Sequence, residues 1–254
     1  MDKFIDYDMF SGETKGRIAV IRFKENLLSN LTNLNAKEKL FSFFRKTELD
    51  NDVRVVLIMG APRRTDTETC RQFYQEFASG KAGIDDLERL NNAINQLVLK
   101  INGYSKMVIH AGQGNTAPVF ANLSLACDWR IIAEDTLFQN PCLDLGLIPK
   151  GGGVYFLSRL MGRDATADML FSGKDVDARA ALALGLVNRV VKTDALETEA
   201  IEAANAFAQK SARALWAIKR LINYPSKELS AFLEYEDDLI RSSYLCSMNC
   251  SGMY

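Results

Sequence analysis

Apolar residues follow two different periods along the first quarter of the chain. Residues 16–23 (GRIAVIRF) and 53–59 (VRVVLIM) are short, rich in β-branched side chains and nearly continuous in apolar character, which is typical of strands. Residues 35–49 repeat apolar side chains at helical spacing, with Asn35 as the expected N-cap. The polar residues 11–16 (SGETKG) are expected to form a hairpin loop before the first strand. This order predicts a right-handed crossover between parallel strands in a sheet buried on both faces.

The stretch of residues 106–162 contains the pattern that most clearly builds a site. An apolar run at residues 107–110 leads through two glycines to Pro118, after which apolar residues recur at helical spacing up to Asp128. A proline in the first helical turn loses no hydrogen bond, so Pro118 predicts a helix start. The free N–H groups at such a terminus suit a negative oxygen on a phosphate or on a thioester carbonyl that gains charge.

The length and the later periodicity define the expected domain organisation. The chain has 254 residues, of which 48% are hydrophobic, and it can therefore bury a substantial core. From residue 192 onward the sequence is rich in amphipathic helical patterns. We expect a core of residues 1–191 and a C-terminal helical region of residues 192–254 within the same folding unit.

Composition excludes several classes of function. A formal net charge of −1 argues against nucleic acid as a partner, and no apolar run has the length of a membrane span or a signal peptide. Five scattered cysteines without a CxxC motif indicate a reducing compartment, no disulfide framework and no metal site. We therefore expect a cytoplasmic protein. The single histidine, His110, lies in an apolar run and is interpreted as a satisfied structural residue.

Several motifs occur together in an order that resembles one known family. They are LACDWRIIAED at 125–135, LGLIP at 145–149, GGG at 151–153, LSRLMGR at 157–163 and GLVNRVV at 185–191. This combination is similar to the enoyl-CoA hydratase/isomerase family, the crotonase superfamily. The resemblance implies an α/β fold, a crotonase-like spiral of ββα turns with a C-terminal helical region. It also implies coenzyme A as part of the substrate with no other cofactor, and a homotrimer or a dimer of trimers.

The resemblance places two unexpected residues where hydratases carry their catalytic glutamates. These are Asn122 and Cys142. Asn122 cannot act as a base near neutral pH, and Cys142 is a nucleophile only as a thiolate, which needs a positive neighbour such as Lys150. A neutral, buried cysteine is the alternative. Asp144 and Glu134 remain as carboxylates near the motif, in positions where exposed turn residues are common.

The oxyanion hole that the resemblance implies is also changed. The family's glycine triplet is replaced by residues 118–120 (Pro-Val-Phe), but the Val119 N–H remains a candidate donor because backbone donation does not require glycine. Thr69 occupies the aligned position for the second donor, on a segment that lacks the family's glycine. The two donors are therefore not certain to converge.

Three basic residues are candidates for substrate contacts. Lys150 aligns with the loop position where a related dehalogenase carries its nucleophilic aspartate, so it is either a solvated loop lysine or a group that stabilises an anion or acts as a base or nucleophile. Arg63 and Arg64 lie in a polar segment, residues 61–90, which is expected to form a loop or lid. The pair either reaches a coenzyme A phosphate or forms a solvated face.

Two classes of function follow from these residues. The first is an enzyme that acts on an acyl-CoA or another acyl thioester by hydrolysis, decarboxylation or isomerisation instead of ordinary hydration. The second is a catalytically inactive crotonase-fold protein that serves binding or assembly, with Val119 and Phe120 filling the acyl pocket.

Overall fold

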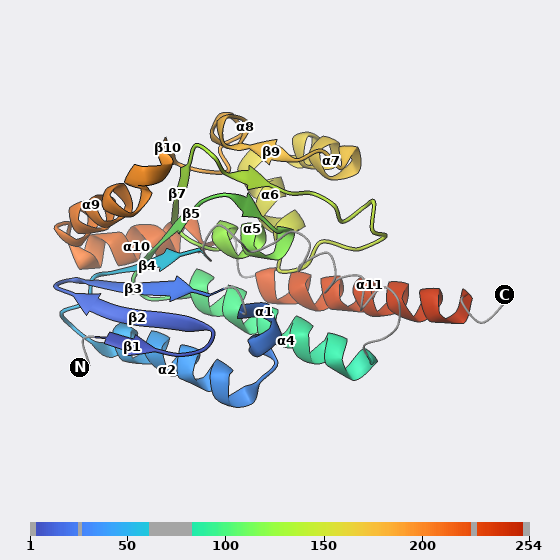
Figure 1. Cartoon of the computed structure of the whole chain (residues 1–254), viewed down its shortest axis with the longest axis horizontal. Coiled ribbons are helices and arrows are strands. Elements are labelled where there is room, and N and C mark those ends of the chain that lie inside the picture. Colours follow the sequence, from blue (N-terminus) through green and yellow to red (C-terminus); the bar gives the residue numbers. More distant parts are fainter. Residues whose placement is uncertain (1–3, 25–26, 61–82, 225–227, 251–254) are drawn as a thin grey trace.

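The computed structural model describes residues 4–24, 27–60, 83–224 and 228–250 (Figure 1). Within these ranges a seven-stranded sheet has the order β1-β2-β3-β4-β5-β7-β10, and a small sheet has the order β6-β8-β9. The strands of the large sheet are β1 (Phe4–Asp6), β2 (Phe10–Lys15), β3 (Ile18–Phe23), β4 (Val55–Met59), β5 (Met107–Gly112), β7 (Trp129–Ala133) and β10 (Arg189–Val191). The small sheet consists of β6 (Asn115–Thr116), β8 (Leu137–Phe138) and β9 (Val176–Asp177). From β3 to β10 all neighbouring strands of the large sheet are parallel, as predicted for β3 and β4.

The N-terminal hairpin differs from its expected form. Five of the six residues SGETKG belong to β2, which pairs antiparallel with β3, and the turn is at Gly16 with φ of +58°. The strand forms because Gly12 leaves room for the core residue Phe43, whose ring lies 2.7 Å from where a Cβ of residue 12 would stand. The expected cap of α2 (Leu34–Leu49) was also wrong, since the Asn33 side chain, two residues earlier, accepts the Ala36 N–H at 3.1 Å.

Strand β4 confirms that the sheet is buried on both faces. Val56 and Ile58 belong to the larger core cluster, whereas Val55 and Leu57 belong to the cluster on the opposite face. The larger cluster is covered by α1 (Leu27–Leu31), α2, α4 (Ile84–Asn102) and α5 (Pro118–Leu125). The second is covered by α9 (Leu196–Ala208), which packs against β4, β5 and β7 and lies at the left of Figure 1.

The remaining helices surround the small sheet and form the C-terminal region. They are α6 (Gly153–Met161), α7 (Arg163–Ser172), α8 (Ala178–Ala183), the 3-10 turn η1 (Thr193–Ala195), α10 (Ala212–Ile222) and α11 (Leu229–Cys250). Asp177 caps α8, and Gly185 follows this helix with φ of +74°. Helix α11 packs along α4 (Figure 1). Among the described helices, none combines the length and the apolar character needed to cross a bilayer. The division at residue 191 stays a prediction.

Candidate active site

Helix α5 begins near the carboxyl ends of β4 and β5, as the glycine-bearing turn and Pro118 predicted. Ala117 is the N-cap in extended conformation, and its carbonyl accepts the N–H groups of Phe120 and Ala121 at 3.0 Å. The Val119 N–H has no hydrogen-bond partner among the described residues. Because the first N–H groups of a helix have no partner within it, this donor remains free for an acceptor outside the helix.

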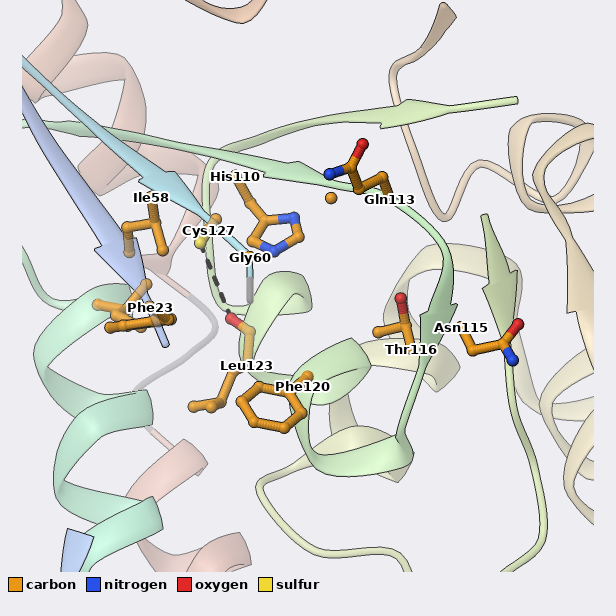
Figure 2. A pocket seen from close by; sticks show the side chains of 12 residues that line it. Phe23, Ile58, Gly60, His110, Gln113, Asn115, Thr116, Phe120, Leu123 and Cys127 are labelled. Carbon is orange, nitrogen blue, oxygen red and sulfur yellow. Dashed lines mark hydrogen bonds between the residues drawn. The ribbon is translucent and has the colours of Figure 1, made fainter. Parts of the chain in front are cut away.

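Two small cavities lie on opposite sides of α5. The histidine pocket is lined by Phe23, Ile58, Gly60, Ile101, His110, Gly112, Gln113, Asn115, Thr116, Phe120, Leu123 and Cys127 (Figure 2). The amide pocket is lined by Pro118, Ala121, Asn122, Leu125, Phe138, Gln139, Asn140, Cys142, Pro149, Leu157, Met169, Leu170 and Leu186. Their volumes are about 30 and 40 Å³. Since one water needs about 10–15 Å³ on this scale, each pocket accepts only a few small groups.

The amide pocket brings together Asn122 and Cys142, the two residues that the resemblance places where hydratases carry their glutamates. Asn122 is buried, and its Nδ2 donates to the Lys150 carbonyl at 2.8 Å. A Cβ on Gly153 would lie 2.4 Å from the same Nδ2. Asn122 therefore holds the glycine loop against α5, and only a glycine at position 153 permits this approach.

Cys142 lies in apolar surroundings that keep its thiol protonated. Its side chain is buried, and burial raises the pKa of the thiol to about 11. A thiolate nucleophile needs a lowered pKa. The environment therefore favours the neutral cysteine of the two alternatives, while a catalytic role of Asn122 or Cys142 stays a prediction.

The expectation of a solvated Lys150 was wrong, because this side chain is buried in an ionic network. Its Nζ lies 2.6 Å from Asn95 Oδ1 on α4, and 3.1 and 2.5 Å from carboxylate oxygens of Glu236 and Asp237 on α11. The residue is 6% exposed. Lys150 thus ties the glycine loop to two helices, and its ammonium group is already engaged by two carboxylates.

Glu236 is the site residue that sequence reasoning missed. Its carboxylate accepts the N–H groups of Gly151 at 2.9 Å and Gly152 at 3.1 Å, and so binds the glycine loop immediately before α6. Burial raises the pKa of Glu236, an effect that Lys150 and these two N–H groups oppose. The available signal was helical spacing, since position 236 falls on the same stripe of α11 as the buried Leu229 and Leu233.

His110 is buried as expected, but it is not satisfied by the residues that the structure describes. It is 8% exposed, and its Nδ1 has no hydrogen-bond partner among them. The ring fills space that two glycines leave: a Cβ on Gly112 would lie 2.8 Å from Cε1, and one on Gly60 would lie 3.5 Å from Nε2. Burial, and secondarily Arg130, lower the pKa of His110 to about 3. The imidazole is therefore neutral throughout the physiological range.

We expect this histidine to make stability fall in mild acid. An unfolded histidine takes up a proton near its ordinary pKa of 6.5, whereas folded His110 does so only near 3, so stability is complete above pH 6.5 and declines as pH falls toward 3. At about 1.4 kcal/mol per pH unit, the free energy of unfolding should drop by about 2–3 kcal/mol more between pH 7 and 4.5 than in a His110→Gln variant. Urea unfolding at both pH values measures this difference. Equal losses in parent and variant would contradict a neutral, buried His110.

Other predicted positions lie apart from this site or outside the described residues. Thr69, Arg63 and Arg64 fall within residues 61–82, which the structure does not describe. Asp144 and Glu134 are exposed, as expected for turn residues. In the described ranges, no group of three or more His, Cys, Asp or Glu residues could hold a metal ion.

Comparisons with known proteins agree on one family. Residues 13–244 match the sequence profile named Enoyl-CoA hydratase/isomerase. A Bacillus subtilis (strain 168) protein named a probable enoyl-CoA hydratase is 32% identical over 206 residues, covering 80% of this chain and 77% of that protein. A Rhizobium meliloti (strain 1021) protein with the same name is 27% identical over 256 residues, covering 98% and 95%.

A solved structure supports the predicted fold class. The crystal structure of enoyl-CoA hydratase from Bacillus halodurans matches with a TM-score of 0.75 at 20% identity, covering 93% of this chain and 95% of that one. At this identity the likeness concerns the fold alone. Together with the parallel sheet, it confirms the crotonase-like α/β architecture.

Proposed function

Because the chain belongs to the enoyl-CoA hydratase/isomerase family, we propose that it binds an acyl-CoA or another acyl thioester at the start of α5. The Val119 N–H donates to the thioester oxygen in this proposal. The supporting observation is that this N–H has no partner among the described residues and belongs to the start of a helix that borders two cavities. Such a donor stabilises an oxygen that gains negative charge during reaction.

The proposed reaction is hydrolysis, decarboxylation or isomerisation instead of ordinary hydration. Hydration requires groups that activate water and protonate the α-carbon. Asn122 already donates to the Lys150 carbonyl, and Cys142 keeps its proton at neutral pH. Neither residue supplies the carboxylate that hydration needs, whereas stabilisation of the thioester oxygen serves the other reactions as well.

A catalytically inactive binding or scaffold protein is the second candidate. Val119 is 1% exposed and Phe120 is 9% exposed, and both belong to the large core cluster. Their side chains occupy volume beside two cavities that are already small. A protein of this kind would retain the fold for assembly without turning over a thioester.

We further propose a cytoplasmic homotrimer or dimer of trimers that uses coenzyme A only as part of the substrate. The exposed apolar residues of α10 support assembly, since Leu221 and Ile222 are 74% and 67% exposed. Apolar patches that remain exposed on one subunit are typical of protein interfaces.

Titration calorimetry with butyryl-CoA, free coenzyme A and buffer alone tests thioester binding. We expect saturable binding of butyryl-CoA that is tighter than that of free coenzyme A, because only the thioester has an acyl carbonyl oxygen that the Val119 N–H can bind at this position. Mass spectrometry of a thioester panel then separates the two candidates. Turnover supports the enzyme, binding without turnover supports the scaffold, and no binding of any thioester contradicts the proposal.

A further inference from the structure

We propose that His110 is a second hydrogen-bond donor to the oxygen of a short acyl thioester, acting together with the Val119 N–H. This inference rests on the proposed function and identifies a catalytic residue for it. A side-chain imidazole would then supply what a second backbone N–H supplies in an ordinary oxyanion hole.

The direction in which the His110 imidazole points is the first observation that supports this role. Figure 2 shows the ring of His110 pointing from β5 into the histidine pocket, toward the space bordered by Phe120 and Leu123 of α5. Its buried Nδ1 lacks a partner among the described residues. Buried polar atoms are nearly always hydrogen-bonded in folded proteins, so an unpaired one on a ring that lines a cavity indicates a ligand atom or a water.

The backbone around His110 holds the ring in place. Gly60 at the end of β4 donates its N–H to the Ala111 carbonyl at 2.7 Å, and any side chain at Gly112 would collide with the ring. The imidazole is therefore confined between two strand ends beside α5. A donor fixed in this way loses little freedom when an oxygen approaches.

The neutral imidazole of His110 is able to donate a hydrogen bond. A neutral imidazole carries one N–H and can place it on Nδ1, which has no other partner among the described residues. The lining includes Phe23, Ile58 and Phe120, and a hydrogen bond to a charged oxygen is stronger in such apolar surroundings than in water. His110 thus stabilises an oxyanion without first having to gain a proton.

The size of the pocket limits the acyl group. A volume of about 30 Å³ accepts two or three water-sized groups, such as the carbonyl end of a short acyl chain, since each group needs about 10–15 Å³. The proposal therefore concerns short acyl thioesters.

Acetoacetyl-CoA is a suitable probe because its acyl group forms an enolate with a negative oxygen and a distinct ultraviolet absorbance. We compare the parent with His110→Phe, which keeps a ring without an N–H, and with His110→Asn, which restores an amide donor. His110→Phe should reduce the preference for the enolate by about 10- to 100-fold, the contribution of a hydrogen bond to a charged oxygen, and should weaken butyryl-CoA binding less, because a neutral carbonyl oxygen accepts a weaker hydrogen bond than an enolate oxygen. His110→Asn should retain most of the preference. Equal enolate preference in all three proteins overturns the inference.

A second measurement needs no variant. The chain contains one histidine, so ¹⁵N-histidine labelling gives the signals of a single imidazole. Addition of acetoacetyl-CoA should shift the Nδ1 resonance and its attached proton, and unchanged histidine signals in the bound protein overturn the inference. If the parent binds neither acetoacetyl-CoA nor butyryl-CoA, both the proposed function and this inference fail. Binding without a histidine response rejects the role of His110 alone.

Discussion

Replacing Lys150 with methionine should lower the free energy of unfolding by about 3–5 kcal/mol, because the change leaves a buried carboxylate without its cation. The side chains of Lys150 and Glu236 are only 5% and 3% exposed, so water does not replace the lost charge. At roughly 2–4 °C per kcal/mol, the Tm falls by roughly 6–20 °C. Thermal and urea unfolding at fixed protein concentration measure both quantities.

The same substitution at an exposed ion pair provides a matched control. Lys24 lies 2.7 Å from Asp6, and the two side chains are 38% and 56% exposed. Lys24→Met should therefore cost no more than about 1 kcal/mol. In addition, Lys150→Met combined with Glu236→Gln should cost less than the sum of the single changes, because the double variant contains no unpaired charge at Glu236. A small loss for Lys150→Met, or additive losses, would contradict the buried network.

Hydration of crotonyl-CoA should be about 10⁴-fold or more slower than in a hydratase that carries both glutamates. General acid and general base groups each contribute typically 10²–10⁴-fold, and both aligned positions lack a carboxylate here. The decrease of the enoyl absorbance at saturating substrate measures this rate. A hydratase with both glutamates serves as the positive control.

The variant Asn122→Asp tests whether a carboxylate at position 122 is enough to restore hydration. The variant supplies a carboxylate of similar size, but it loses the donor to the Lys150 carbonyl at 2.8 Å. We expect no gain in hydration and a stability loss of about 1–3 kcal/mol from the unpaired carbonyl. Hydration by the parent at an ordinary rate would show that another carboxylate, such as Asp144 or Glu134, had taken over the chemistry.

Sequence patterns predicted the elements whose formation depends on residues close together in the chain. Strand β4 followed from an unbroken apolar run, and the start of α5 followed from Pro118, because both signals act within a few residues. The expected loop at SGETKG was wrong because β2 is stabilised by pairing with β3 and by Phe43 above Gly12. These contacts come from residues that no local pattern connects.

In the candidate site, too, nearby motifs were informative, whereas contacts between residues far apart in the chain could not be predicted. Asn122 and Cys142, which the resemblance placed at the positions of the hydratase glutamates, line one pocket, while their roles stay a prediction. The partner of Lys150 could not be predicted because Glu236 lies 86 residues away on α11. The unpaired Nδ1 of His110 likewise depends on how β4, β5 and α5 meet, which an isolated apolar run does not reveal.

The crystal structure of the complex with acetoacetyl-CoA would show directly whether the start of α5 binds a thioester oxygen in a site whose hydratase carboxylates have been replaced. We expect the acyl oxygen to accept a hydrogen bond from the Val119 N–H and to lie in reach of His110, with Asn122 still bound to the Lys150 carbonyl. A thioester bound away from α5, or one whose reacting carbons lie against a carboxylate placed to activate water, would contradict this expectation.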